Sequence, residues 1–310
     1  MLNVFILIFG FILLIKGSDT FVESASSIAK KFKVPPIVIG LTIIAMGTSA
    51  PELSTSITSS LKGMNDMSIA NVVGSNIFNL LVALGVSSMF GKLKINNYKD
   101  IWMLLGTCLG LLLMAINRSL GMLNGIILLI TFTMYILSLI KQAKNNKNNK
   151  DNKEEQEDNG KQRNLLSTIL LGILGLVAIV YGGDLVVNSA SAIALTLGMS
   201  ENLVGLTIVA LGTSLPEFVT SVIATKKGQL ELAIGNIVGS NIFNILLILG
   251  VASTIKPLTI SAVALIDIFF MTFTVVMFVC LTKKTKVLSR NKGILMVLVY
   301  IGYLLFTILL

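Results

Sequence analysis

Two short polar strings lie inside otherwise apolar parts of this chain, and their residue types are those that bind hard cations. The first is "AMGTSAPELSTS" (45–56) and the second is "ALGTSLPEFVTS" (210–221). Each holds a carboxylate, several hydroxyls and a proline. Because proline lacks an N–H and its ring clashes with the carbonyl four residues back, we expect a helix break near Gly47, with freed carbonyls around Ala45 and Met46.

The spacing within each string places its oxygen atoms on one side of the helix. Thr48 and Ser49 precede Glu52 by four and three residues, so their side chains share a face where helical geometry persists. Glu52 also falls in the first turn of the resumed helix, where the helix dipole stabilises an anion. In the next apolar segment, Ser75 and Asn79 are again four residues apart. The second half repeats the set with Ala210, Thr213, Ser214, Pro216, Glu217, Ser240 and Asn244.

Together these residues offer carboxylate, amide, hydroxyl and carbonyl oxygens, and the chain contains no histidine. Ca²⁺ binds six to eight oxygen ligands in flexible cages, whereas Mg²⁺ retains its waters and softer metals prefer nitrogen or sulfur. The ligand set therefore predicts a calcium site.

The charge of this site predicts how it would work. Two nearby glutamates repel each other by about 4 kcal/mol at an effective dielectric near 20, and a charged residue at mid-bilayer costs roughly 2.5 to 3.5 kcal/mol. An empty, doubly ionised site should therefore resist occlusion, while one Ca²⁺, monovalent cations or protons would neutralise it. We expect only filled sites to switch between the two sides, which is the behaviour of an obligatory antiporter.

The elements that must position these residues are membrane helices. Of the 310 residues, 54% are hydrophobic and 13% are charged, and several apolar runs reach the roughly 20 residues that a helix needs to cross a bilayer. The first run has neither a basic leader nor a small-residue cleavage site, so we interpret it as a retained helix. We predict an all-α polytopic membrane protein with ten transmembrane helices, at about 2–29, 35–61, 67–90, 100–117, 120–140, 164–195, 202–225, 229–254, 259–281 and 293–310.

The positive charges predict the orientation of these helices. With the N-terminus outside, 20 of the 24 Lys and Arg residues fall in loops on the inner side, as the positive-inside rule requires. The longest polar stretch, 141–163, cannot bury a core and is expected to be a solvated cytoplasmic linker between halves 1–140 and 164–310. We expect both termini outside the plasma membrane. The net charge of +9 then reflects topology and does not indicate a nucleic-acid partner.

The two halves are related by an internal repeat. A shift of 165 aligns residues 17–88 with 182–253 without a gap, and 12 of the 18 positions from 39 to 56 are identical. Because five spans per half is an odd number, the second half must enter the membrane from the opposite face. Such inverted-topology repeats are typical of secondary transporters, whose substrate site lies at the repeat interface near the midplane.

These features resemble the Ca²⁺/cation antiporters and, most closely, the prokaryotic Na⁺/Ca²⁺ exchangers. The resemblance rests on "GTSAPE…GSNIFN" and "GTSLPE…GSNIFN", the ten spans and the central linker. It implies alternating access, with the first and sixth helices sliding against the other eight. Several relatives carry Asp where this chain has Asn244, which leaves K⁺ co-transport and Na⁺ stoichiometry open. The resemblance implies ion coordination by Glu52, Glu217, Thr48, Ser49, Thr213, Ser214, Ser75, Asn79, Ser240 and Asn244, and by the carbonyls of Ala45 and Ala210.

Other polar residues in the apolar segments are expected to be structural. Asn76 and Asn241 lie one residue away from the Ser/Asn face and should cap or join helices. Asp19 and Asp184 occupy matching repeat positions and should make structural polar contacts, although lining an ion path is the alternative. Asp267 has no repeat partner in the membrane and is expected near an interface.

Two other functions stay open. H⁺/Ca²⁺ exchange would use the same glutamates, because a buried carboxyl can hold a proton. A cation channel would use the same oxygen-lined site, but one site at an inverted-repeat interface suits alternating access better than a continuous pore. We expect no enzyme activity, because the chain has no His and no evident Ser/Lys or paired-Asp arrangement. We expect no cofactor, and as partners only Ca²⁺, Na⁺ or H⁺ and the lipid bilayer, with the monomer as the functional unit.

Overall fold

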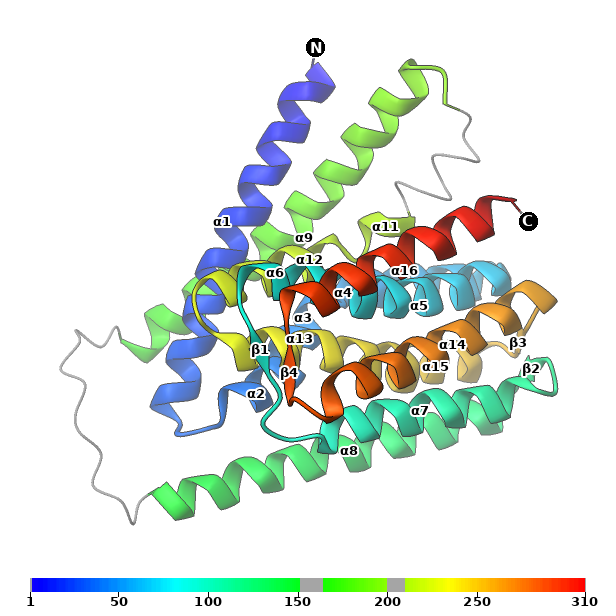
Figure 1. The fold of residues 1–310 in the computed structure, drawn as a ribbon. Helices are drawn as coiled ribbons and strands as arrows, with labels where there is room; N and C mark the ends of the chain where they lie inside the picture. Colours follow the sequence, from blue (N-terminus) through cyan, green and yellow to red (C-terminus); the bar gives the residue numbers. More distant parts are fainter. Residues whose placement is uncertain (1, 151–163, 200–209, 310) are drawn as a thin grey trace.

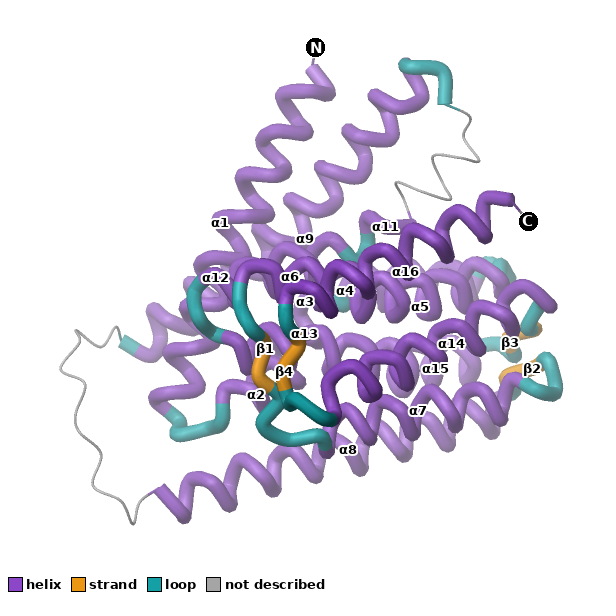
Figure 2. The backbone as a smooth tube through the Cα atoms, viewed as in Figure 1, coloured by secondary structure: helices purple, strands orange, loops and turns teal. Residues whose placement is uncertain are grey.

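The computed structural model describes residues 2–150, 164–199 and 210–309, and these are predominantly helical (Figure 1, Figure 2). Six of the described helices are long and apolar enough to cross a membrane, or seven if the bent pair Pro36–Thr48 and Ala50–Leu61 is one span. The predicted polytopic all-α class is consistent with this. The count of ten stays a prediction, because the expected span 202–225 lies partly outside the described residues and α7 has only 17 residues.

The first half contains two interrupted helices between longer ones. The interruptions are single turns of π-helix, labelled η. The elements are α1 (Leu2–Lys31), α2 (Pro36–Ile39), η1 (Gly40–Ile44), α3 (Ala45–Thr48), α4 (Ala50–Leu61), α5 (Asn65–Phe78), η2 (Asn79–Ala83), α6 (Leu84–Phe90), β1 (Leu93–Lys94), α7 (Lys99–Ala115), β2 (Ser119–Leu120) and α8 (Met122–Lys150).

The second half repeats this order. Its elements are α9 (Leu165–Thr196), α11 (Ala210–Gly212), α12 (Leu215–Lys226), α13 (Leu230–Phe243), η4 (Asn244–Ile248), α14 (Leu249–Ile255), β3 (Leu258–Thr259), α15 (Ala262–Lys283), β4 (Val287–Leu288) and α16 (Arg290–Leu309). Helix α8 continues to Lys150, so the first part of the expected solvated linker, 141–150, is helical; the linker itself stays a prediction. The rest of that segment, 151–163, lies outside the described residues.

Helices α1 and α9 run side by side and lean away from the other helices (Figure 1). Glycines let the two backbones approach each other closely. A Cβ atom on Gly17 would lie 2.8 Å from the carbonyl oxygen of Gly175, and one on Gly182 would lie 2.9 Å from that of Gly10. Small residues at such crossings are typical of helix pairs that associate within a membrane.

Contacts between the two halves are reciprocal, as an inverted repeat requires. Strand β1 pairs antiparallel with β4, and β2 pairs antiparallel with β3. Asn76 Nδ2 donates to the Asn241 carbonyl at 3.2 Å, and Asn241 Nδ2 donates to the Asn76 carbonyl at 3.1 Å. These two asparagines are repeat equivalents, so the pseudo-two-fold axis passes between them. They join helices of the two halves, as predicted.

The interrupted helices form the centre of the molecule. In its most apolar window, the run Leu230–Ile255 is 94% buried and the run Met67–Phe90 is 72% buried, whereas α1 is only 28% buried. The polar residues in these central helices therefore face protein and not lipid. Buried polar groups of this kind require partners or a ligand.

Candidate functional site: an oxygen-lined centre between the two halves

The first polar string forms a helix break at Ser49. This residue, with φ −84° and ψ 10°, separates α3 from α4, and the two parts of the helix are bent by 49°. Pro51 lies in the first turn of α4, where its missing N–H costs little. The break therefore falls two residues after the predicted position at Gly47. In the second string, Ser214 (φ −89°, ψ 2°) and Pro216 have the same roles.

The backbone carbonyls at the break differ from the prediction in one respect. The Ala45 carbonyl is not freed, because it accepts the Ser49 N–H at 3.0 Å. The carbonyl that loses its helical donor to Pro51 is that of Gly47, four residues earlier. The Ala45 oxygen still has a second lone pair, and Ser240 Oγ lies 3.5 Å from it. In the second half, the Ser214 N–H bonds to the Leu211 carbonyl at 3.3 Å, one residue later than the repeat equivalent Ala210.

The structure brings the two glutamates together between the halves. Glu52 and Glu217 are both 0% exposed. Each accepts a hydrogen bond from the serine of the opposite string: Ser49 Oγ donates to Glu217 Oε1 at 2.7 Å, and Ser214 Oγ donates to Glu52 Oε1 at 3.2 Å. Each of these serines precedes the glutamate of its own string by three residues, so the crossed hydrogen bonds set both carboxylates in one site. Two like charges at this depth create a strong demand for a cation.

Several buried oxygen atoms in this region have no hydrogen-bond partner among the described residues. Such groups are rare in folded proteins, because an unsatisfied buried acceptor costs about 1 to 3 kcal/mol. Five of them belong to the candidate set: Glu52 Oε2, Glu217 Oε2, Ser75 Oγ, Asn79 Oδ1 and Asn244 Oδ1; Asn241 Oδ1, next to this set, is unpartnered as well. These are hard oxygen donors, which suit Ca²⁺ and Na⁺.

The asparagines of the candidate set lie where the helices change geometry. Asn79 begins η2 and Asn244 begins η4. Single π-turns are uncommon in proteins as a whole, and those that occur are often found at functional sites. The two asparagines differ in their contacts: Asn244 Nδ2 donates to Asn76 Oδ1 at 3.0 Å, whereas neither polar atom of the Asn79 amide has a partner in the described residues.

Two residues that contact the candidate ligands were missed in the sequence. Asn71 Oδ1 accepts from Thr213 Oγ1 at 3.3 Å, and Asn236 Oδ1 accepts from Thr48 Oγ1 at 3.1 Å. A signal was available, because Asn71 opens the repeated string "NVVGSNIFN" and lies four residues before Ser75. That spacing puts it on the same helix face as the predicted ligands.

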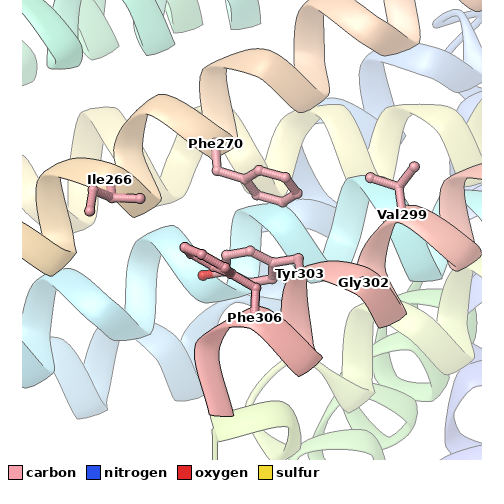
Figure 3. Close-up of a pocket in the computed structure, with 6 residues that line it drawn as sticks. All are labelled: Ile266, Phe270, Val299, Gly302, Tyr303 and Phe306. Carbon is pink, nitrogen blue, oxygen red and sulfur yellow. The ribbon is translucent and has the colours of Figure 1, made fainter. Parts of the chain in front are cut away.

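A cavity elsewhere in the molecule is unsuited to cations. It has a volume of about 350 Å³ and lies between α15 and α16. Figure 3 shows aliphatic and aromatic side chains around it, with the Phe270 and Tyr303 rings stacked at 4.4 Å. Tyr303 directs its hydroxyl to Asp267 Oδ1 at 2.8 Å, so this carboxylate has a structural partner. The lining residues are Ile266, Phe270, Val299, Gly302, Tyr303 and Phe306.

The fold and the central site define a class: a polytopic helical membrane protein with a buried, oxygen-lined site between two inverted halves. The family model described as "Sodium/calcium exchanger protein" matches residues 2–141 and 167–309. The chain belongs to this family. The family inferred from the sequence is thereby confirmed, and so is the class of a polytopic helical membrane protein.

Named relatives and solved structures agree with this assignment. The chain is 34% identical to the sodium/calcium exchanger MaX1 of Methanosarcina acetivorans, with 97% of each chain covered. It is 30% identical to the inner membrane protein YrbG of Escherichia coli, over 81% of this chain and 79% of that one. The structure of the sodium-calcium exchanger NCX_Mj, from a soak with Na⁺ and Ca²⁺, matches with a TM-score of 0.85 at 31% identity, covering 97% of each chain.

Proposed function

We propose that this protein is a secondary active antiporter that exchanges Ca²⁺ for Na⁺ by alternating access. The observation that carries the proposal is the reciprocal pair of Ser–Glu hydrogen bonds, which sets two buried carboxylates from opposite halves in one site. The likeness to MaX1 and NCX_Mj supports Na⁺ as the counter-ion. The protein is a transporter and not an enzyme, and its ions are substrates rather than cofactors.

In this mechanism Glu52 and Glu217 together balance one Ca²⁺. The hydroxyls, the amides of Asn79 and Asn244 and the carbonyls of Ala45 and Ala210 complete its oxygen shell. Na⁺ takes over some of the same oxygens when Ca²⁺ leaves. Because the vacant site holds two like charges in a low dielectric, it opens to one side or the other but does not occlude.

The proposed placement in the membrane follows the positive charges. Both termini lie outside the plasma membrane, and the segment 141–163 lies in the cytoplasm. The ten spans form two repeats, 1–140 and 164–310, and the monomer is the functional unit. This orientation places the Lys227 loop at the cytoplasmic end and the Lys62 loop at the outer end.

An asymmetry between the halves supports alternating access. Lys227 Nζ lies 2.9 Å from Asp19 Oδ1 and 3.7 Å from Glu23 Oε2, which ties the loop after α12 to α1. The repeat equivalents Lys62 and Asp184 are both described, yet they form no ion pair with each other in the structure. When access switches sides, inverted halves exchange conformations. The Lys62–Asp184 pair is therefore expected to close when the Lys227–Asp19 pair opens.

Removal of either lysine should shift this equilibrium, and the two shifts should have opposite directions. Exposed ion pairs are worth about 0.2 to 1 kcal/mol, so Lys227→Ala should favour the inward-open state by up to about five-fold. Lys62→Ala should favour the outward-open state by a similar factor. The measurement is the half-saturating Ca²⁺ concentration on each side of oriented vesicles. Equal shifts in the same direction, or no shift in either variant, would contradict the exchange of ion pairs.

The proposed function itself is tested by ion-swap fluxes in proteoliposomes. We expect Ca²⁺ uptake under a Na⁺ gradient at matched pH, and none under a pH gradient without Na⁺. The reverse result would establish H⁺/Ca²⁺ exchange by the same glutamates. Ca²⁺ conductance that is independent of any counter-ion would instead establish a channel.

A further inference from the structure

We propose that Asn71 and Asn236 are positioning residues of the ion site. Each holds a threonine of the opposite half so that the hydroxyl oxygen is available to a cation. Asn236 lies on α13 and is 1% exposed; its repeat equivalent Asn71 lies on α5 and is half-buried. This inference rests on the proposed function only in taking Ca²⁺ as the cation.

The orientation of the Asn236 side chain is set by its own half of the molecule. Its Nδ2 donates to Ser221 Oγ at 2.9 Å and to the Glu217 carbonyl at 3.3 Å. A carboxamide has two N–H donors, both on the nitrogen, so both are used. The oxygen must then point the other way, and Thr48 Oγ1 lies 3.1 Å from it.

This orientation decides where the Thr48 hydrogen points. The hydroxyl has one hydrogen, and three oxygens lie around it in hydrogen-bond geometry: the Ile44 carbonyl at 3.1 Å, the Ala45 carbonyl at 3.4 Å and Asn236 Oδ1. The Glu217 carboxylate is also near this hydroxyl. Threonines in helices usually donate back to a carbonyl of their own helix. Here that choice would leave two bare acceptor oxygens 3.1 Å apart, which repel each other. Donation to Asn236 avoids the repulsion. It leaves the lone pairs of Thr48, and the lone pair of the Ala45 carbonyl that the Ser49 N–H does not use, available to a cation.

The other half of the molecule has the same arrangement. Asn71 Nδ2 donates to Ser56 Oγ at 2.9 Å and to the Glu52 carbonyl at 3.2 Å, and Asn71 Oδ1 accepts from Thr213 at 3.3 Å. Each amide thus connects the backbone of one glutamate to the threonine of the opposite half. A helper residue of this kind, which orients a ligand without touching the ion, typically changes metal affinity by about 10- to 100-fold when it is removed.

The test is a set of double-mutant cycles read by Ca²⁺ titration calorimetry on the purified full chain. We expect Asn236→Ala and Thr48→Val each to raise the Ca²⁺ dissociation constant by about 10-fold or more. The double variant should bind Ca²⁺ no more weakly than the weaker-binding of the two single variants, because both changes remove the same Asn236–Thr48 interaction. Thr48→Ser keeps the hydroxyl and should bind nearly as the wild type does.

The crossed pairs provide the matched control. Asn236→Ala with Thr213→Val should multiply the two single effects, and so should Asn71→Ala with Thr48→Val, since these residues do not contact each other. If the effects on Ca²⁺ affinity are as additive in the contacting pairs, Asn236 with Thr48 and Asn71 with Thr213, as in the two crossed pairs, the inference is overturned. Wild-type affinity in both asparagine variants would also overturn it. If Asn236→Ala does not fold, the cycle at the half-buried Asn71 and Thr213 decides the question. Because binding is read directly, a wild type that fails to couple Na⁺ to Ca²⁺ flux would refute the antiport proposal and leave this test intact.

Discussion

Glu52→Gln and Glu217→Gln are each expected to abolish measurable Ca²⁺ exchange without unfolding the protein. Each removes one of the two negative charges that balance the ion, and truncating one partner of a buried charge pair costs about 2 to 5 kcal/mol. That range corresponds to a loss of affinity of about 30-fold at the least. Folding should be retained, because a neutral amide relieves the cost of burying a carboxylate and still offers an oxygen to the serine of the opposite half.

The measurement is Ca²⁺ uptake into proteoliposomes, together with thermal unfolding of each purified variant. Glu231→Gln is the matched control, because Glu231 lies in the first turn of α13 and its carboxylate accepts from Asn96 at 2.7 Å, outside the buried centre. It should keep wild-type uptake. Retained exchange in both Glu52→Gln and Glu217→Gln would place the ion site elsewhere.

Gly239→Ala is expected to reduce stability and Ca²⁺ affinity together. A Cβ atom at this position would lie 2.7 Å from both the Cα and the carbonyl oxygen of Leu41, and 2.9 Å from the Ala45 Cβ. Both of these Leu41 atoms belong to the backbone, so a side-chain rotation cannot relieve the clash. Helix α13 must therefore move away from η1. Overpacking of this kind costs about 1 to 3 kcal/mol. The same movement separates Ser240 on α13 from the Ala45 carbonyl, which lies 3.5 Å from its Oγ, and so disturbs the site.

The control for this substitution is Gly106→Ala in α7. A Cβ atom on Gly106 would meet nothing within 4 Å among the described residues, so the change should be neutral, or stabilising by about 0.5 to 1 kcal/mol. Melting temperature and Ca²⁺ affinity of the two variants are the readouts. A Gly239→Ala variant with wild-type values for both would show that close packing of α13 on η1 does not position the site.

The repeated strings made the fold class and the meeting of the two halves predictable. Two copies of one motif, in halves each predicted to have an odd number of spans, leave few arrangements besides an inverted pair. Long apolar runs also defined helix ends closely: the expected span 164–195 is α9, Leu165–Thr196. The extension of α8 to Lys150 was not predictable from polarity, because Lys, Asn and Gln are all tolerated in a solvated helix.

Other details depend on tertiary contacts that a linear pattern does not contain. The π-turn at Asn79 leaves the apolar character of its segment unchanged, so periodicity does not reveal it. The bonding of the Ala45 carbonyl depends on the exact residue at which the break falls. The roles of Asn71 and Asn236 depend on threonines in the opposite half of the chain, and neither partner can be identified before the halves are docked.

The most direct test of the central claim is anomalous diffraction from crystals of this protein soaked with Sr²⁺ as a substitute for Ca²⁺. We predict one strong peak between the two halves, within coordination distance of carboxylate oxygens from both Glu52 and Glu217. The corresponding peak should be lost in either Gln variant. A peak bound by only one of the two glutamates, or by neither, would contradict a single shared cation site.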